Sequence, residues 1–448
     1  MTRTVAIVGG GASGTLVASL LVRASEAMHV VIIDPCERLG RGVAYATGFP
    51  RHTLNVPAAK MSALASDRDH FVRWLAANAG DAYGPSSFVP RSLYGDYLGD
   101  IATEARVAAP DRWRHVRSSA LDVRLENDGV HVTCSNGAIV RADRLVVATG
   151  NASPAAWPNM SPEARRSRRY FGSTWDPGAL TPDSPGEPVV LLGTGLTAVD
   201  ALFGLRENGH RGPITMVSRR GLLPLEHAAS NATAATSLEA DTASGLLSAL
   251  RDRVREMPAS GGDWRGYVDA LRPHTNAMWK ALSLVEQRRF LRHALPYWNV
   301  HRHRMPPEAA KAVADRVAAG TLRVLAGRTG AITVSGDLLR VPVALRGSAD
   351  VVTIDAGRVI NCSGPQQDVR KLADPFVRRL LAHGLMVPST LGIGMSLAEN
   401  GALVDADGTA STRLFAIGPA CFGPLIETTA MPDIREQARD LAAFLSAG

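Results

Sequence analysis

A glycine-rich turn near the start of the chain limits the available folds more than any other feature. Gly9, Gly11 and Gly14 follow the apolar run at residues 5–8 and precede an apolar stretch with helical spacing. The first glycine permits a tight turn, the second lets the backbone approach a pyrophosphate, and the third lets the helix pack on the strand. This order predicts a Rossmann-type dinucleotide-binding unit. The alternative is an ordinary glycine turn of an α/β protein.

The residues around this turn agree with a bound adenosine diphosphate. A second apolar run ends at Asp34, about 20 residues beyond Gly14, which is the usual reach to a ribose hydroxyl. The diphosphate would lie on the N–H groups of Ala12 and Ser13, at a helix N-terminus whose dipole favours negative charge.

A second strand–turn–helix pattern, with the turn G-x-G-x-x-A, begins near residue 189. The turn residues expected to contact a cofactor are Gly193, Thr194, Gly195, Leu196 and Thr197. The following strand ends at Arg219 and Arg220, where the first unit has an acid. An acid pairs with a free ribose 2′-hydroxyl, whereas arginines accommodate a 2′-phosphate, so this turn is predicted to bind NADPH. Alternatively, the two arginines are surface charge after a strand.

The order of these units predicts an α/β protein with two Rossmann-like dinucleotide-binding domains and a mainly helical insertion in the second. A Pro/Gly/Ser-rich connector marks the boundary. The expected limits are 1–185 with 365–448 for the first domain, 186–364 for the second, and about 226–320 for the insertion, where amphipathic spacing recurs. Two buried strands end in glycine and return to the turns, one at Thr149-Gly150 and one at Gly364.

Local patterns give more detailed expectations. The segment 35–46 is too glycine-rich for a helix and is expected to be a loop. Helices are expected at 67–77, with Ser66 as a candidate cap, and at 93–107. Short strands within 113–148, with a turn at Asn136-Gly137, predict a small antiparallel sheet. A last helix is expected from about 432 to 446.

Composition argues against several classes of protein. The 448 residues are 46% hydrophobic and 20% charged, which is ordinary for a globular enzyme. The net charge of +7 suits an anionic ligand, but the basic residues are scattered, so no nucleic-acid partner is expected. The four cysteines are far apart, so neither a redox dithiol nor a metal site is expected. With no leader-like start and no apolar run of membrane length, we expect a cytoplasmic protein.

Motifs spread over nearly the whole chain are shared with one family of flavoproteins. They are GRGVAY at 40–45, LNVP at 54–57, GTGLTAVD at 193–200, SRRGLLP at 218–224, HRHRM at 301–305 and PDIR at 432–435. On these motifs the chain resembles the YdhS-like FAD/NAD(P)-binding oxidoreductases, relatives of the class B flavin monooxygenases. The resemblance implies FAD at the first turn and NADPH at the second.

The resemblance and the turns together give one set of expected cofactor-binding residues. They are Gly9, Gly11, Ala12, Ser13, Gly14, Asp34, Arg41, Asn55, Val56, Thr149, Gly150, Gly193, Thr194, Gly195, Leu196, Thr197, Arg219, Arg220, Gly364, Gly418 and Pro419. The N-terminus of the last helix, directed at the isoalloxazine ring, would stabilise negative charge on the reduced flavin.

Two positions depart from the wider group. Baeyer–Villiger-type relatives carry F-x-G-x-x-x-H before the second turn, and the segment from Phe171 to Pro177 lacks the histidine. Many flavoproteins have Gly-Asp where this chain has Gly418-Pro419, so backbone N–H groups between Ala420 and Ile426 would have to replace the carboxylate that holds the ribityl chain.

The resemblance implies an NADPH-dependent FAD monooxygenase that uses O2 and a flavin C4a-hydroperoxide. The expected substrate is small and polar, for example one with an amino or carboxylate group, and N-hydroxylation is one outcome. The alternatives are a flavin oxidoreductase that inserts no oxygen and a non-catalytic, flavin-bound redox sensor or scaffold.

Candidate catalytic residues lie in two segments. Asn55 is expected to contact the flavin; alternatively, it caps a turn before Pro57. The second segment is the cluster His301, Arg302, His303 and Arg304, which either lines the cleft and binds an anion or forms a charged loop.

Three further polar residues receive weaker expectations. Lys60 is expected to be solvated, with a flavin contact as the alternative. His227 is expected at the surface, with the nicotinamide ribose as the alternative contact. Asp200 is expected to complement the dipole of its helix.

Overall fold

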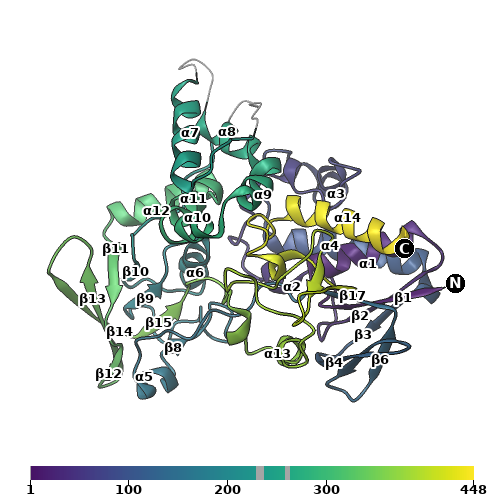
Figure 1. Cartoon of the computed structure of the whole chain (residues 1–448). Coiled ribbons are helices and arrows are strands. Elements are labelled where there is room, and N and C mark those ends of the chain that lie inside the picture. Colours follow the sequence, from purple (N-terminus) through teal and green to yellow (C-terminus); the bar gives the residue numbers. More distant parts are fainter. Residues whose placement is uncertain (1, 229–236, 258–262, 448) are drawn as a thin grey trace.

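The computed structural model describes residues 2–228, 237–257 and 263–447. Figure 1 shows two lobes, each built on a β-sheet, with a layer of helices above the second lobe. Parts of the expected helical insertion, residues 229–236 and 258–262, lie outside the described residues. None of the helices formed by the described residues has the length and hydropathy of a membrane span.

The first sheet carries the first glycine turn. Its six strands run in the order β16-β17-β7-β1-β2-β3, and every pair except β16–β17 is parallel. The strands are β1 (Arg3–Val8), β2 (Met28–Ile33), β3 (Trp113–Val116), β7 (Arg144–Val147), β16 (Ala402–Val404) and β17 (Ala410–Ala416). Because β17 lies beside β7, the end of the chain belongs to the same sheet as its start.

Both faces of this sheet are covered, which explains its continuous apolar runs. One face packs against helices α1 (Ala12–Ala24), α4 (Arg91–Ala108) and α14 (Met431–Ala447). The other face packs against α13 (Pro375–Ala382) and a small antiparallel sheet. The strands of that sheet are β4 (Ala120–Glu126), β5 (Gly129–Cys134) and β6 (Ile139–Ala142), as predicted from the hairpin signal.

The second sheet repeats the parallel arrangement around the second glycine turn. Its strands run in the order β12-β13-β11-β10-β9-β15-β8, with β14 paired to β13. The parallel strands are β8 (Tyr170–Phe171), β9 (Val189–Leu192), β10 (Ile214–Ser218), β11 (Leu322–Thr329) and β15 (Arg358–Asn361). The antiparallel strands are β12 (Thr333–Ser335), β13 (Leu338–Leu345) and β14 (Val351–Ala356). Helix α6 (Leu196–Glu207) follows β9.

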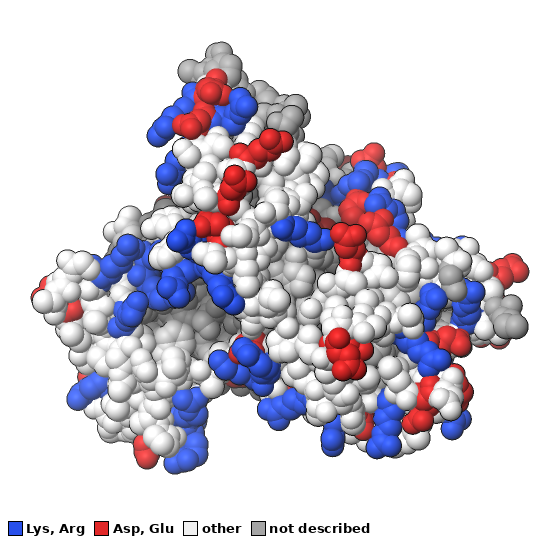
Figure 2. All heavy atoms as spheres, in the orientation of Figure 1, with Lys and Arg blue, Asp and Glu red and all other residues white. Residues whose placement is uncertain are grey.

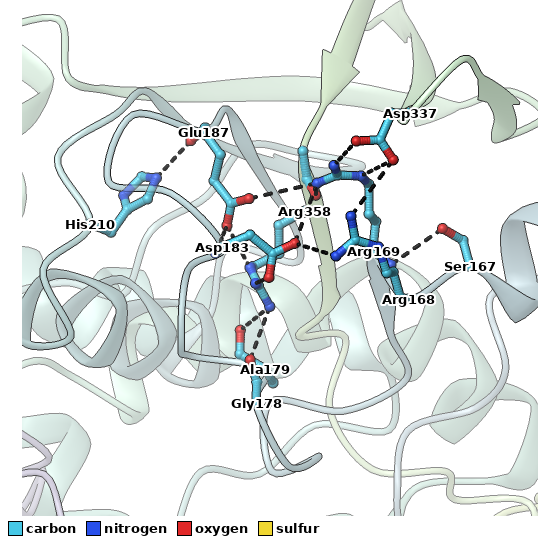
Figure 3. A network of polar contacts seen from close by, with 11 residues as sticks. Ser167, Arg168, Arg169, Gly178, Ala179, Asp183, Glu187, His210, Asp337 and Arg358 are labelled. Carbon is cyan, nitrogen blue, oxygen red and sulfur yellow. Dashed lines mark hydrogen bonds and ion pairs between the residues drawn. The ribbon is translucent and has the colours of Figure 1, made fainter.

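The connector between the sheets belongs in part to the second one, which corrects the boundary expected at residue 185. Strand β8 pairs with β15, and the short helix α5 (Pro162–Arg166) precedes it. In Figure 3, Arg358 of β15 lies between two carboxylates of the connector, with N···O distances of 2.8 Å to Glu187 and 3.2 Å to Asp183. Its guanidinium also donates to the carbonyl of Gly178 at 2.9 Å. These buried bonds fix the connector to the second sheet.

The helical insertion forms the upper layer in Figure 1. Its helices are α7 (Ala243–Arg255), α8 (Trp264–Ala270), α9 (Arg272–Ala281), α10 (Leu284–Arg289), α11 (Leu295–Arg302) and α12 (Pro307–Ala318). A π-helical turn, Phe290–Ala294, joins α10 to α11. The cluster at 301–304, for which a charged loop was one alternative, therefore begins at the end of a helix.

The two domains meet at α6. Asp200 of α6 pairs with Arg91 of α4 at 2.9 Å, and its carbonyl lies 2.9 Å from Nε2 of His52. The expectation that Asp200 serves its own helix dipole is therefore wrong, because its carboxylate is committed to a contact between domains.

Two local expectations are also corrected. Residues Gly42–Tyr45 form one helical turn, α2, rather than a continuous loop, because positive φ at Gly40 and Gly42 completes the bend before it. Helix α3 (His70–Ala79) has Asp69, not Ser66, at its N-cap position.

Candidate functional site: a cavity between two glycine turns

The two glycine turns have the same construction. At Gly9 (φ +104°), a Cβ would lie 2.3 Å from the carbonyl oxygen of Ala148, at the end of β7. At Gly193 (φ +137°), a Cβ would lie 2.4 Å from the carbonyl oxygen of Cys362, at the end of β15. Each turn therefore passes against the strand that returns to it, and any side chain there would collide with backbone.

The helices that follow these turns can receive anions. Within the described residues, neither α1 nor α6 has a side-chain N-cap bond or an acid in its first turn. A Cβ at Gly11 would approach Gly42 at 3.4 Å, and one at Gly195 would meet no described atom within 4 Å. Open backbone at a helix N-terminus is what a pyrophosphate requires, so both turns fit a dinucleotide.

One large cavity lies at the ends of the parallel strands of both sheets. Its volume is about 1570 Å³. The first domain contributes Thr149 and Gly150 after β7 and Pro419 after β17. The second contributes Gly195, Leu196 and Thr197 after β9, and Pro365 to Gln367 after β15. Ligands of α/β proteins bind outside the carboxyl ends of strands, and this volume exceeds the ~300–1,000 Å³ typical of one small ligand.

Asp34 has the geometry for a ribose contact. Its Oδ2 accepts the N–H of Gly10 at 2.6 Å, and its Oδ1 accepts the N–H of Cys36 at 2.8 Å. Each carboxylate oxygen has a further lone pair, so this positioned carboxylate can also accept a ribose hydroxyl. Arg41, by contrast, already has an acidic partner, Asp96.

The arginines after β10 lie beside the helical insertion. Arg219 is exposed. Arg220 donates to the carbonyl oxygen of Arg292 at 3.2 Å, and its guanidinium carbon lies 5.6 Å from the ring centre of Tyr297. Figure 2 shows Lys and Arg side chains gathered below the insertion, where Figure 1 draws β10 and β11. Positive charge is thus available beside the second turn, but Arg220 already has protein partners.

Asn55 and Val56 lie outside the cavity lining. The carbonyl oxygen of Asn55 lies 2.9 Å from Nε2 of His227, and Val56 packs against the core of the first domain. His227 is therefore half-buried, and the expectation that it lies at the surface is wrong. Lys60 is exposed as expected, but its Nζ lies 3.1 Å from Asp269 of the insertion.

The His301–Arg304 cluster divides into separate environments, and only His303 lines the cavity. Arg302 forms a buried two-pronged ion pair with Glu427, at 2.9 and 3.2 Å. Arg304 is buried and donates to Asp269 at 2.7 Å. His301 lies 2.8 Å from the carbonyl oxygen of Tyr297. The prediction that this cluster presents free arginines to an anionic substrate is wrong, because both guanidinium groups are neutralised within the protein.

His303 is held neutral. Burial is the main cause, with the positive charges of Arg302, Arg272 and Arg304 adding to it, and together they lower its pKa to about 3. Burial and Arg304 also lower the pKa of His227 to about 4. A neutral imidazole has one donor and one acceptor nitrogen, so His303 offers the cavity a group that can hold or pass a proton without carrying charge.

These shifts predict a loss of stability in acid. Between pH 6.5 and 4 the unfolded chain protonates both histidines and the folded chain does not, so the unfolded state binds more protons and stability falls as the pH is lowered. We expect His303→Gln to reduce the fall in unfolding free energy between pH 7 and 5 by about 1–2 kcal/mol. Urea unfolding at both pH values measures this difference. An unchanged fall would contradict a neutral His303.

The loop after β17 begins at the first glycine turn. A Cβ at Gly418 (φ +73°) would lie 2.5 Å from Oγ of Ser13, at the N-terminus of α1. Several N–H groups expected to replace the missing carboxylate are already used. Those of Phe422, Gly423, Leu425 and Ile426 donate to Pro419, Leu425, Cys421 and Asn276 respectively. In the second turn, the side-chain hydroxyl of Thr194 likewise has protein partners, because it hydrogen-bonds to the hydroxyl of Ser218 and donates to the carbonyl oxygen of Leu222.

Four charged residues of this region were missed in the sequence. Glu427 and Asp433 come from the C-terminal segment, and Asp269 and Arg272 from the insertion. Burial raises the pKa of Glu427, against the opposite effect of Arg302. The one available signal was Asp433 in the PDIR motif. Trp298 also lines the cavity.

The geometry defines a class of protein: two parallel-sheet domains, each with a glycine turn, whose strand ends line one cavity, as in flavoproteins with two dinucleotide-binding domains. Residues 6–152 match the family model described as FAD-NAD(P)-binding, which confirms the prediction of an FAD- and NAD(P)-binding protein.

One curated protein is similar to this chain in sequence. The chain is 22% identical over 258 residues to "Uncharacterized protein YdhS" of Escherichia coli (strain K12). The match covers 50% of this chain and 46% of that protein, so it spans about half the length of the relative. The resemblance inferred from the motifs is thus confirmed.

Solved structures share the fold over the whole chain. Ornithine hydroxylase PvdA from Pseudomonas aeruginosa superposes with a TM-score of 0.66 at 14% identity, and L-lysine 6-monooxygenase from Pseudomonas syringae with 0.67 at 15%. Each comparison covers 100% of this chain and 99% of the other. The bacillithiol disulfide reductase of Staphylococcus aureus has a TM-score of 0.59 at 12% identity, with 100% and 98% covered. At such identities the likeness concerns the fold, and it confirms the predicted α/β class.

Proposed function

We propose that the protein is an NADPH-dependent FAD monooxygenase that oxygenates a small polar substrate with an amino or carboxylate group. The observation that carries this proposal is a cavity of about 1570 Å³ that is lined by Gly195, Leu196 and Thr197 of the second glycine turn and by Thr149, Gly150 and Pro419 at the strand ends of the first domain. The volume suits the reacting ends of two cofactors with a small substrate between them. The fold shared with ornithine and lysine hydroxylases supports the same reaction class.

Each glycine turn binds a different cofactor. Gly9 to Gly14 and Asp34 bind FAD, whose ribose has a free 2′-hydroxyl, and Gly193 to Thr197 with Arg219 and Arg220 bind NADPH. The remaining first-domain contacts to FAD are Thr149, Gly150, Gly418 and Pro419. When bound, a flavin supplies hydride acceptance and oxygen activation, which is chemistry that the cofactor itself carries.

The residues of this chain supply orientation, exclusion of water and a proton path. Trp298, Leu295 and Val300 of α11 form an apolar wall of the cavity, which limits water at the reacting centre. His303, neutral at the C-cap position of α11, can accept a hydrogen bond at one ring nitrogen and donate one from the other, so it can relay a proton and stay uncharged. Asn299 and Gln366, also in the lining, offer polar contacts to an amino or carboxylate group.

The alternative is a flavin oxidoreductase that inserts no oxygen, in line with the fold shared with bacillithiol disulfide reductases. The cysteines argue against a dithiol version of that reaction. All four are described and free, and burial raises the pKa of Cys362 and Cys421 to about 12, so neither is a ready thiolate. A non-catalytic, flavin-bound redox sensor or scaffold is the third hypothesis.

Isotope labelling tests the proposal. The FAD-loaded protein is given NADPH and ¹⁸O2 with a panel of primary amines and amino acids, ornithine and lysine among them. We expect faster NADPH oxidation with one substrate class and one ¹⁸O atom in the product. Hydrogen peroxide as the only oxygen product throughout the panel would favour the oxidoreductase alternative, and failure of NADPH to reduce the flavin would favour the sensor.

The arginines after β10 are expected to select NADPH over NADH. Arg219→Ala with Arg220→Ala should weaken NADPH binding by about 1.5–3 kcal/mol per charged hydrogen bond lost and leave NADH binding unchanged. Steady-state KM values for both nucleotides measure this preference. Arg323→Ala, an exposed arginine near the start of β11, is the matched control. If the double variant keeps its preference for NADPH, these arginines do not read the 2′-phosphate.

A further inference from the structure

One face of α9 binds the C-terminal segment of the first domain. Arg272, Asn276 and Trp279 are spaced four and three residues apart, so they lie on the same side of the helix. Arg272 donates two hydrogen bonds to Asp433, at 2.7 and 2.5 Å. The indole N–H of Trp279 donates to the carbonyl oxygen of Gly423 at 2.8 Å. Both ends of this contact region are therefore fixed by the insertion of the other domain.

Asn276 fixes the middle of the segment. Its Oδ1 accepts the backbone N–H groups of Ile426 and Glu427, both at 3.0 Å, and its Nδ2 donates to the carbonyl of Glu427 at 2.9 Å. One amide thus satisfies three backbone groups of the loop.

Two ion pairs, one partly buried and one fully buried, reinforce this contact. Arg272 pairs with Asp433 in the first turn of α14, and Arg302 pairs with Glu427. The arginines come from the insertion and the acids from the first domain's segment, so the charges balance only when the two parts are together. Loss of one partner would leave an uncompensated buried charge.

The segment that α9 holds is part of the cavity wall. It starts at Gly418, against Ser13 of the first glycine turn, and its residues Phe422, Ile426 and Thr429 line the cavity. Pro419 replaces the usual aspartate, and Asn276 already accepts the N–H groups of Ile426 and Glu427, so the stretch would offer a ligand the backbone beyond them, at the cavity-lining residue Thr429. Backbone contacts are effective when the backbone is held in place before binding.

We propose that α9 and Arg302 complete the FAD site from the second domain by positioning the segment 423–433 at the cofactor. These residues are positioning residues, and they make FAD binding by the first domain depend on the insertion of the second. This inference rests on the proposed function for the identity of the cofactor, but it requires neither NADPH nor oxygen.

The test measures FAD release from the purified holoprotein after dilution, by the return of free flavin fluorescence. Trp279→Phe keeps an aromatic, though smaller, ring and removes the N–H donor, and we expect FAD to bind about threefold to tenfold more weakly. Asn276→Ala removes three hydrogen bonds, and we expect a loss of tenfold or more. Lys280→Ala, an exposed neighbour on the same helix, is the control and should change nothing.

Thermal unfolding and the flavin absorption spectrum distinguish two roles for these contacts: positioning the segment 423–433 at FAD, or only holding the two domains together. The proposal expects weaker FAD binding and a shifted flavin spectrum in both variants. A lower unfolding temperature with unchanged FAD release and spectrum would overturn it, and so would two variants identical to the parent protein. If the parent protein binds no FAD, the proposed function itself fails, which is a different result from either of these.

Discussion

Arg302→Ala is expected to lower the free energy of unfolding by about 3–5 kcal/mol. The side chains of Arg302 and Glu427 are 6% and 4% exposed, so the substitution leaves a carboxylate buried without its partner. That carboxyl, whose pKa burial already raises, should then take up a proton in the folded state. The folded state binds more protons than the unfolded state, so the destabilisation should grow as the pH rises from 5 to 8. Urea unfolding at the two pH values measures it.

Two further variants show whether the loss of stability comes from the buried, unpaired charge. Arg302→Met combined with Glu427→Leu removes both charges and should recover most of the lost stability. Lys311→Ala, which breaks an ion pair whose lysine is 76% exposed, should change stability by about 0.5 kcal/mol or less. If Arg302→Ala keeps full stability and only raises the KM of an anionic substrate, then Arg302 binds substrate, as the sequence alone had indicated.

Gly195→Ala is expected to weaken NADPH binding by about 2–3 kcal/mol, or roughly 30- to 150-fold, without loss of FAD. Residue 195 has φ −81° and ψ −172°, which alanine adopts freely, and its Cβ would meet no described atom within 4 Å. The protein should therefore fold normally. The added methyl group would lie where a pyrophosphate must approach the backbone. Equilibrium titration with NADP⁺ measures the affinity.

Gly11→Ala is the matched variant in the first turn. Residue 11 has φ −69° and ψ −168°, and its Cβ would approach Gly42 at 3.4 Å, an ordinary contact. We expect this variant to fold, to lose FAD and to retain NADP⁺ affinity. Gly14→Ala differs from both because its Cβ would lie 1.9 Å from the carbonyl oxygen of Gly9, so it should fail to fold correctly. Loss of the same cofactor in both Gly11→Ala and Gly195→Ala would contradict the division of cofactors between the turns.

The glycine turns could be predicted because their constraints are local. A tight turn between a strand and a helix requires particular residues at fixed spacing, and the acid or arginines at the end of the next strand follow the same geometry. The small antiparallel sheet and its Asn136-Gly137 turn were predictable for the same reason.

The polar contacts between domains could not be predicted. Arg272 and Asp433 are 161 positions apart, and Arg302 and Glu427 are 125 apart, so no local pattern pairs them. The sequence cannot distinguish an arginine that is free to bind a ligand in a cleft from one that is buried and paired with an acid. The chemistry of the cluster at 301–304 was therefore misread, although its position near the cavity was correct for His303.

Two structural errors have simple physical causes. A charged loop was one of the two alternatives for residues 301–304, yet α11 extends to Arg302, because its Pro296 lies in the first turn, where a helix tolerates proline. Strand β8 contains two residues, which is too short for any periodic signal, so the connector was assigned to the first domain.

The central claim is that FAD and NADPH meet in one cavity between the two domains. Anaerobic mixing of the FAD-loaded protein with NADPH, followed by flavin absorbance, tests it most directly. We expect NADPH to bleach the flavin faster than NADH does, and deuterium at the transferred position of NADPH to slow the bleaching. A flavin that stays oxidised under saturating NADPH, or one that bleaches without an isotope effect and with no preference between the nucleotides, would contradict it.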